Sequence, residues 1–233
     1  MKKLGVLCSN REYFTKYIQW IHEEDGKRFD LVGCLSDDKT RYEKEVQNFK
    51  SCDDDIFSKC DIILSLGYWK IIPKNVIDAV PMGILNLHHS YNLKYRGRHT
   101  CSWALINREQ VHGSTLHYMS PTLDYGPILA SECVQILNSD TAETLFNKVD
   151  NIGFKLVKEN LNKALERNLF HELSWPTGEY FSYRERDLKQ EVLYPIDDAR
   201  FERNVRALTF SGKPLPYVIT NGKKIYLKLD ESC

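Results

Sequence analysis

The strongest constraint on the fold is the alternation of short apolar runs with longer amphipathic segments in the first part of the chain. The apolar runs are LGVLC (4–8), FDLVGCLS (29–36), CDIILSLGYW (60–69) and GILNLHHS (83–90). Between them lie segments at 12–24, 40–50 and 73–79 that favour helices. Strands that alternate with helices are joined by right-handed crossovers and form a mostly parallel sheet. The sequence therefore predicts an α/β fold, in which ligands bind at the carboxyl ends of the strands.

The middle of the chain adds further elements to this sheet. The expected elements are a helix at 99–108 and strands at 113–119 and 128–136. Asp140 and Glu143 form a capping-box pattern ahead of a long helix that should end near residue 168. We expect a Rossmann-like, mostly parallel sheet flanked by helices.

The composition changes after Trp175, where aromatic and charged residues become frequent. Asn221-Gly222 lies between two alternating apolar runs, which is a strong signal for a β-hairpin. We therefore divide the chain into a main domain of residues 1–175 and a small C-terminal β-containing appendage of residues 176–233.

The charge balance limits which partners the chain attracts. Among its 233 residues, 32 lysines and arginines balance 32 aspartates and glutamates, so no global field draws the protein to nucleic acid or to an anionic membrane. No stretch approaches the ~20 apolar residues of a membrane span. The 7 cysteines include no Cys-x-x-Cys pair and are expected to be reduced, buried thiols. We expect a cytoplasmic protein.

The fourth apolar run ends in polar groups that could carry chemistry. Alternation places Asn86 and His88 on one side of the predicted strand, so an amide and a titratable imidazole point into the same space. Asp124 lies in a loop rich in Pro and Gly. Taken singly, each residue has an ordinary explanation as a turn cap, a solvated histidine or an Asx-turn aspartate. We expect no metal site at His88, His89 and His117, because adjacent histidines on a strand point to opposite faces and no ligand spacing supports one.

Together these residues and their neighbours resemble one family. The shared pattern consists of Asn86-x-His88-x-Ser90, Arg96-Gly97, Trp103-Ala104-Leu105-Ile106, Gly113-x-Thr115-x-His117 and Asp124-x-Gly126-x-Ile128-Leu129. In its order and spacing it is similar to the core of the formyltransferases that use 10-formyltetrahydrofolate. The resemblance implies that Asn86, His88 and Asp124 form a catalytic triad. The chain departs from the family pattern after the triad histidine, where His89 replaces a proline and Tyr91-Asn92-Leu93 replaces Leu-Leu-Pro.

The chemistry of formyl transfer agrees with these roles. Transfer to an amine passes through a tetrahedral intermediate whose oxyanion needs hydrogen-bond donors. The amide of Asn86 and a protonated His88 supply donors, and the imidazole can also take a proton from the attacking ammonium and return one to the leaving folate nitrogen. Asp124 would orient His88 and stabilise its charged form.

The resemblance also implies where the folate donor binds. The segment SLGYWKIIP (65–73) is similar to the family segment that lines the pterin pocket. The residues expected to contact the folate are Tyr68, Trp69, Lys70 and Ile71 in this segment, and Asp124, Tyr125 and Gly126 in the loop that closes the other side.

Within the family, the sequence favours a nucleotide-linked amino sugar as the acceptor. The stretch LCSNREYF (7–14) lacks the glycines that would cradle the phosphate of glycinamide ribonucleotide. The chain also lacks the length and the basic charge of the initiator-tRNA enzyme. The remaining resemblance is to the sugar N-formyltransferases, which act on substrates such as dTDP-4-amino-4,6-dideoxyglucose for surface polysaccharide synthesis.

Polar and aromatic side chains on either side of the predicted boundary suit a sugar nucleotide. The residues expected to contact it are Ser90, Tyr91, Arg96, Arg98, Tyr180, Phe181, Tyr183 and Arg186. The aromatic rings would stack on a pyrimidine base and the arginines would meet the pyrophosphate. The alternative is that these aromatic residues simply cover the main sheet.

Two other interpretations stay open. A formyltetrahydrofolate hydrolase would use the same triad with water as the acceptor, although such enzymes carry an N-terminal regulatory domain that this chain lacks. A non-enzymatic protein would bind a sugar nucleotide or a folate with an idle triad. The predicted hairpin and the aromatic tail would suit the two-fold contact of a homodimer.

Overall fold

The computed structural model describes residues 1–9, 14–36, 54–166, 173–177, 179–183, 188–192 and 198–230. The chain forms two compact units, each built from several segments of the sequence. The first unit comprises Met1–His88, Thr115–Ser131 and Gly153–Thr177. The second unit comprises His89–Ser114, Glu132–Ile152 and Gly178–Cys233. The sequence-based division into a main domain of residues 1–175 and an appendage of residues 176–233 stays a prediction.

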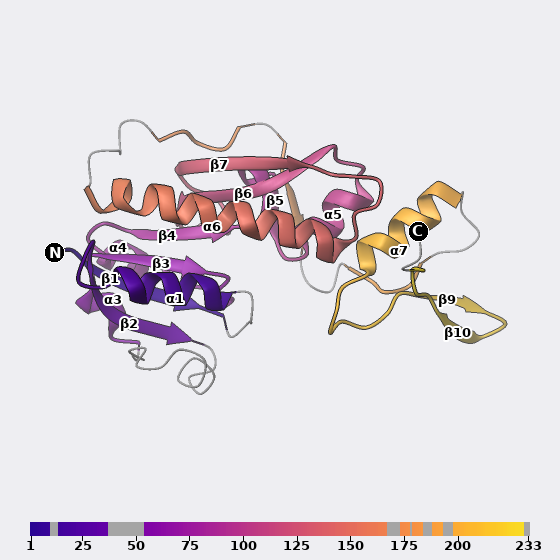
Figure 1. The fold of residues 1–233 in the computed structure, drawn as a ribbon, viewed down its shortest axis with the longest axis horizontal. Coiled ribbons are helices and arrows are strands. Elements are labelled where there is room, and N and C mark those ends of the chain that lie inside the picture. Colours follow the sequence, from indigo (N-terminus) through magenta and orange to yellow (C-terminus); the bar gives the residue numbers. More distant parts are fainter. Residues whose placement is uncertain are drawn as a thin grey trace. The chain divides into compact units, whose positions relative to one another are not determined.

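The largest sheet is 6-stranded, with the order β2-β1-β3-β4-β6-β7 (Figure 1). Its strands are β1 (Lys3–Cys8), β2 (Asp30–Ser36), β3 (Ile62–Leu66), β4 (Ile84–His88), β6 (Val111–Tyr118) and β7 (Ile128–Gln135). Strands β1 to β4 pair in parallel, and β6 runs antiparallel to β4. This arrangement confirms the predicted mostly parallel, Rossmann-like α/β class.

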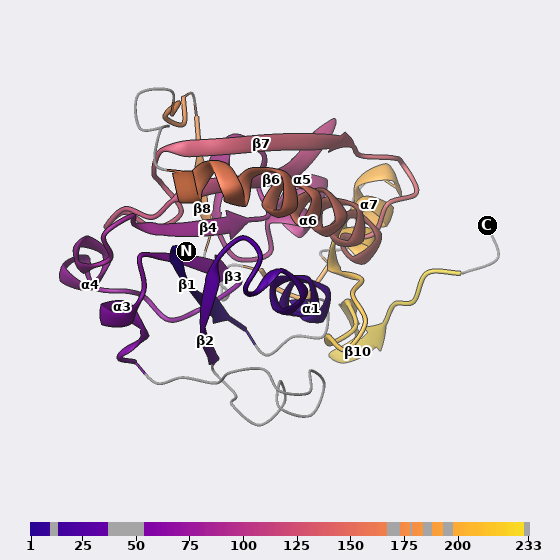
Figure 2. The same ribbon diagram turned by 60° about the vertical axis from the view of Figure 1, so that its left-hand side comes forward.

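Helices cover both faces of the parallel strands (Figure 2). The helices are α1 (Thr15–Glu24), α3 (Ile56–Lys59), α4 (Lys74–Ala79), α5 (Thr100–Ile106), α6 (Ala142–Glu166) and α7 (Asp198–Leu208), with a short 3₁₀ turn η2 (Tyr91–Leu93). On one face, Tyr17 of α1 and Val157 of α6 share a buried cluster with Leu64 of β3. On the other face, Ile56 of α3 and Ile77 of α4 form a second cluster, called here the α3–α4 core. Within the described residues, no helix has both the length and the apolarity that crossing a bilayer requires.

The predicted cap of the long helix is wrong by one residue. Thr141 and Thr144 cap α6 instead of Asp140 and Glu143, and the backbone N–H of each donates to the side-chain oxygen of the other, at 2.9 and 3.1 Å. Asp140 is engaged elsewhere, because it accepts two hydrogen bonds of 2.7 and 2.8 Å from Nζ of Lys148. Burial raises the pKa of Asp140, but the hydrogen bonds from Lys148, from a backbone N–H and from Thr144 outweigh burial and hold the pKa below its usual value.

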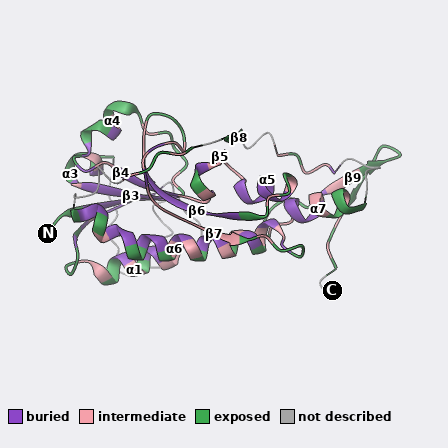
Figure 3. Ribbon diagram, turned by 90° about the horizontal axis from the view of Figure 1, so that it is seen from above, coloured by how far each residue is buried: buried purple, intermediate pink, exposed green. Residues whose placement is uncertain are grey.

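The second unit contains the predicted hairpin, formed by β9 (Tyr217–Thr220) and β10 (Lys223–Tyr226). Asn221 and Gly222 have positive φ values of 48° and 73°, as both central residues of a two-residue type I′ turn require. The hairpin is largely exposed (Figure 3). The hairpin prediction is therefore confirmed.

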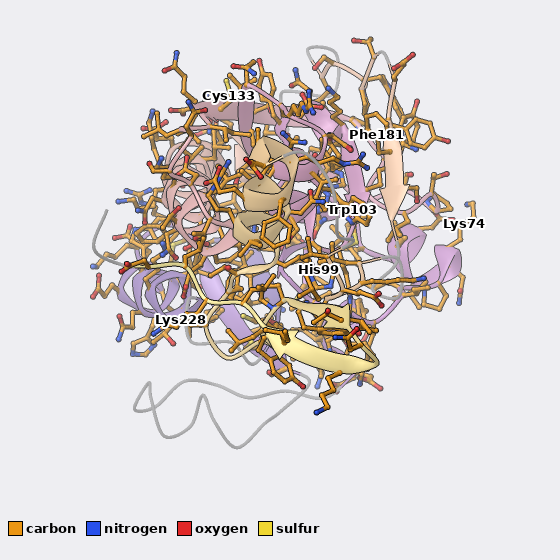
Figure 4. All side chains as sticks on the ribbon, turned by 90° about the vertical axis from the view of Figure 1, so that its right-hand side faces the viewer. Lys74, His99, Trp103, Cys133, Phe181 and Lys228 are labelled. Atoms are coloured by element: carbon orange, nitrogen blue, oxygen red, sulfur yellow. The ribbon has the colours of Figure 1, made fainter. Side chains whose placement is uncertain are left out.

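Three elements of the second unit were not predicted. Helix α7 presents Val205 and Leu208 to a buried cluster, and this apolar spacing is visible in the sequence once Asp198 is taken as its start. Strands β5 (Tyr95–Gly97) and β8 (Phe181–Tyr183) form a short parallel pair. Figure 4 shows Phe181 on β8. The helix expected at 40–50 lies outside the described residues.

Candidate active site

Three strands place polar side chains next to one another on one face of the sheet. The pairing of β3 with β4 sets Ser65 beside Asn86, and the pairing of β4 with β6 sets Asn86 beside His117. This is the face of the α3–α4 core, because Ile84, two residues before Asn86, packs in that core. All three polar residues are buried. A buried polar row within an apolar sheet is costly, so its members need partners or a function.

The contact between Asn86 and His117 fixes the orientation of both groups. Nδ1 of His117 lies 2.9 Å from the carbonyl oxygen of Tyr118, which can only accept, so Nδ1 carries the proton. Nε2 of the neutral ring is then an acceptor, and Nδ2 of Asn86 donates to it across 3.1 Å. Burial, with a smaller contribution from His88, lowers the pKa of His117 to about 4 despite the opposing charge of Asp124. The Asn86 amide is therefore oriented by a neutral histidine at neutral pH.

His88 faces Asp124, the residue that the resemblance groups with it in a triad. Nε2 of His88 and Oδ2 of Asp124 are 3.7 Å apart, which is an ion-pair distance and longer than a hydrogen bond. Their side chains are 11% and 13% exposed, so water screens the pair only weakly. Asp124 adopts a left-handed backbone conformation, with φ of 42°. Such strained positions concentrate at functional sites.

The loop that carries Asp124 is held close to the Asn86–His117 pair. Oγ of Ser120 donates to the carbonyl of Tyr125 and accepts from the backbone N–H of Thr122 at 3.2 Å. At Gly126 a Cβ atom would lie 2.0 Å from the carbonyl oxygen of Tyr118, the group that accepts the His117 proton. Gly126 therefore allows a close approach of two backbone segments, a role that the sequence analysis did not assign to it.

We expect Gly126→Ala to displace this loop. Because the added methyl group meets backbone, which cannot rotate away, the variant should lose about 1–3 kcal/mol of unfolding free energy. Urea unfolding measures the loss. The exposed Thr122→Ala in the same loop is the control and should change stability by less than about 0.5 kcal/mol. Equal stabilities of wild type and Gly126→Ala would contradict the close approach.

His117 should make the stability of the fold depend on pH. Its pKa is about 4 in the fold against a usual value of 6.5, so between these values the unfolded chain binds a proton that the folded chain does not. Stability should therefore fall as the pH decreases from 6.5 to 4, by at most about 3 kcal/mol. His117→Gln keeps an acceptor but does not titrate, so it should remove this part of the pH dependence. Urea unfolding across the window tests this, and parallel curves for the two proteins would refute it.

Trp69, Lys70 and Ile71, expected to contact the folate, follow β3 and are exposed. Trp69 is 56% exposed and Ile71 is 87% exposed. Tyr68 is half-buried and packs against the α3–α4 core, as does Met119 at the start of the Asp124 loop. The two expected folate segments thus both reach the face of the sheet that carries Asn86.

The residues expected to contact a sugar nucleotide lie in the second unit. Arg96 of β5 stacks on Tyr180, with the guanidinium carbon 3.5 Å from the ring centroid. Phe181 stacks on Tyr95, with centroids 5.2 Å apart and planes at 19°. Ser90 is buried, and its Oγ accepts a 2.8 Å hydrogen bond from the N–H of Tyr95. Tyr180 and Arg96 are therefore brought together, while Ser90 and Phe181 both contact Tyr95.

The other expected contacts are half-buried or lie outside the described region. Tyr91 and Arg98 are half-buried. Arg186 and the side chain of Tyr183 are outside the part of the chain that the structure describes. His89 faces a partner different from that of His88, because its Nε2 lies 3.4 Å from Oδ1 of Asp150. Among the described residues, no group of three or more His, Cys, Asp or Glu side chains is arranged to hold a metal ion.

Comparisons with curated proteins find relatives that are longer than this chain. It is 33% identical over 179 residues to the bifunctional polymyxin resistance protein ArnA of Wigglesworthia glossinidia brevipalpis, covering 75% of this chain and 26% of ArnA. It is 30% identical over 169 residues to the methionyl-tRNA formyltransferase of Clostridioides difficile (strain 630), covering 72% of this chain and 53% of that enzyme. The chain thus spans about half or less of these relatives.

Solved structures match nearly the whole chain. A 4-N formyltransferase from Francisella tularensis has a TM-score of 0.81 at 21% identity, covering 98% of this chain and 97% of that one. An N-formyltransferase from Helicobacter canadensis, in complex with folinic acid and dTDP-3-aminofucose, has a TM-score of 0.79 at 18% identity, covering 97% and 86%. At these identities, the TM-scores establish a shared fold. Residues 35–161, more than half of the sequence, match the family model described as formyl transferase, and this chain therefore belongs to the formyl transferase family.

Proposed function

We propose that this protein transfers a formyl group from 10-formyltetrahydrofolate to the amine of a nucleotide-linked amino sugar. One arrangement inside the family-matched region carries the proposal: an oriented amide and a His–Asp pair occur together. The Asn86 amide donates to His117, and the largely buried side chains of His88 and Asp124 face each other. The donor supplies a formyl group on a nitrogen that can leave.

Asn86 would stabilise the negative charge that develops on the formyl oxygen. One N–H of its amide donates to His117, and this contact holds the second N–H in a fixed direction. A preorganised donor needs no reorientation as the charge forms, which is why such groups accelerate acyl transfer. The neutral state of His117 is essential here, because a protonated Nε2 would compete with Asn86 as a donor and break the contact.

His88 would move the protons of the reaction. The nitrogen of the attacking amine becomes an ammonium that must lose a proton, and the departing folate nitrogen must gain one. An imidazole performs both steps near neutral pH. Asp124 would stabilise the imidazolium formed between these steps. Their 3.7 Å separation leaves room to tighten when substrates bind, as contacts at catalytic sites often do.

The donor would cover exposed apolar side chains on the segment after β3. Trp69 and Ile71 are exposed on the segment after β3, and an apolar group in water is stabilised when a flat ligand covers it. Tyr68, Lys70, Asp124, Tyr125 and Gly126 complete the proposed folate contacts. The folinic acid bound by the Helicobacter canadensis enzyme, which shares this fold, supports the assignment.

The second unit would hold the sugar nucleotide. Tyr180 is 56% exposed and is backed by the guanidinium of Arg96, so its outer face can stack on a base. Arg98 and Arg186 would contact the pyrophosphate, with Tyr91 and Tyr183 nearby in the sequence. The dTDP-3-aminofucose bound by the Helicobacter canadensis enzyme supports an amino sugar on dTDP.

A second acceptor, methionyl-tRNA, is suggested by the sequence relatives. The Clostridioides difficile enzyme is 30% identical over the compared region. Binding an RNA backbone depends on an excess of basic residues, and here 32 basic residues balance 32 acidic ones. We therefore favour the sugar nucleotide. A role in surface polysaccharide synthesis, a cytoplasmic location, a homodimer and an acceptor-binding or dimerising function of residues 176–233 remain predictions.

Competition between acceptors tests the proposal. The protein is incubated with 10-formyltetrahydrofolate, a panel of amino-sugar nucleotides and methionyl-tRNA, and each acceptor is analysed by mass spectrometry. We expect formylation of an amino-sugar nucleotide and none of the tRNA. Formylated tRNA would overturn the acceptor, and formate released without any acceptor product would favour the hydrolase.

A further inference from the structure

Exposed apolar side chains are concentrated in a few places in the first unit. Apart from Met1 at the chain end, the large apolar side chains exposed in the described part of this unit are Trp69, Ile71, Leu123 and Trp175. The first three belong to the segments proposed to hold the folate. Trp175 comes from a distant part of the sequence and is not among the residues expected to contact the folate or the sugar nucleotide.

Trp175 is attached to the Asp124 loop by direct contacts. Its ring lies 5.3 Å from that of Tyr125, centroid to centroid, with the planes at 46°. The preceding residue, Ser174, accepts a 2.7 Å hydrogen bond from the N–H of Ile128, and Leu173 packs against the core on the α1 face. The hydrogen bond at Ile128 and the packing of Leu173 thus hold Trp175 beside Tyr125.

The contact with Tyr125 leaves part of the Trp175 ring accessible, because Trp175 remains 50% exposed. A half-exposed indole that contacts the tyrosine next to Asp124 in the chain is suited to a flat ligand, because stacking removes apolar surface from water and adds a ring–ring contact.

We infer that Trp175, together with Tyr125, forms an aromatic wall that binds a flat ring of the reduced folate. This inference rests on the proposed function and adds to it a residue beyond the family-matched region, which ends at residue 161. Trp175 is a binding residue in this account and takes no part in proton transfer. Its loss should therefore weaken donor binding more than it slows the chemical step.

Affinity for a non-reactive folate provides the first test, with 5-formyltetrahydrofolate as the probe. Trp175→Ala should raise its Kd about 2- to 12-fold, the range expected for one lost aromatic contact. Trp175→Phe keeps an aromatic face and should lose less. Leu137→Ala removes an exposed apolar side chain, 49% exposed, from the second unit and should leave the Kd unchanged.

Tryptophan fluorescence provides the second test and uses variants with conservative changes. In Trp69→Phe, titration with 5-formyltetrahydrofolate should still quench emission, because Trp175 remains. In Trp69→Phe/Trp175→Phe the quenching should vanish, although Trp20, which packs against Phe154, and Trp103 are still present.

The outcomes separate this inference from the proposed function. If the wild type shows no saturable binding of 5-formyltetrahydrofolate, the proposed function fails and the inference fails with it. If the wild type binds but Trp175→Ala binds equally well, the inference is overturned and the proposed function stands. If Trp175→Ala does not fold, the two phenylalanine variants decide, and quenching that is already lost in Trp69→Phe, where Trp175 is still present, overturns the inference.

Discussion

His88→Ala should be folded and almost inactive in formyl transfer. General acid–base catalysis by a positioned side chain contributes ~10²–10⁴ in rate, so kcat should fall by about that factor. KM should change much less, because the proton transfers occur in the transition state and not on substrate binding. Single-turnover rates measured with saturating donor and acceptor give the chemical step directly.

The neighbouring histidine is a matched control for this variant. His89 lies next to His88 in the chain, but its side chain faces Asp150 in the second unit. His89→Gln retains a polar side chain and should keep kcat within a few-fold of the wild type. The proton-transfer role is untenable if His88→Ala, with native thermal stability, retains more than about a tenth of wild-type kcat.

Asn86→Ala should lose the stabilisation of the oxyanion while keeping the shape of the pH–rate profile. Removal of one preorganised oxyanion donor costs ~10²–10³ in kcat. The profile should keep its shape because Asn86 does not titrate and the groups that move protons are still present. Steady-state rates measured from pH 6 to 9 provide both the fall in kcat and the shape of the profile.

A double-variant cycle with His117 shows whether the amide acts as the structure suggests. If His117 contributes to catalysis by orienting Asn86, His117→Gln alone should lower kcat. The same substitution should lower kcat little further when Asn86 is already alanine. Additive effects on kcat in the double variant would mean that the two residues act separately. This result would contradict the orienting role assigned to their 3.1 Å contact.

The parallel part of the sheet was predictable because β1 to β4 are largely buried on both faces and read as continuous apolar runs. The runs at 29–36, 60–69 and 83–90 contain β2, β3 and β4. The β5–β8 pair was missed because its strands have only three residues each and lie far apart in the sequence. The cap of α6 was misassigned because Asp140 and Thr141 are both good cap residues. Only the contact of Asp140 with Lys148 shows which one is engaged elsewhere.

The candidate site could be predicted only in part. The alternation of a strand places Asn86 and His88 on one face, which is local information. The partner of Asn86 is not local, because its pairing with His117 depends on the register between β4 and β6. The same holds for Trp175, whose contact with Tyr125 follows from one hydrogen bond between Ile128 and Ser174.

The fate of the formyl group is the most direct test of the account. Under single-turnover conditions, donor carrying an isotopically labelled formyl group is mixed with excess wild-type protein and an amino-sugar nucleotide, and the label is followed by NMR spectroscopy. We predict that the label passes from the folate nitrogen to an amide on the sugar, and that this transfer is lost in His88→Ala. Label that appears as formate while the amine is present, or that stays on the folate, would contradict the account.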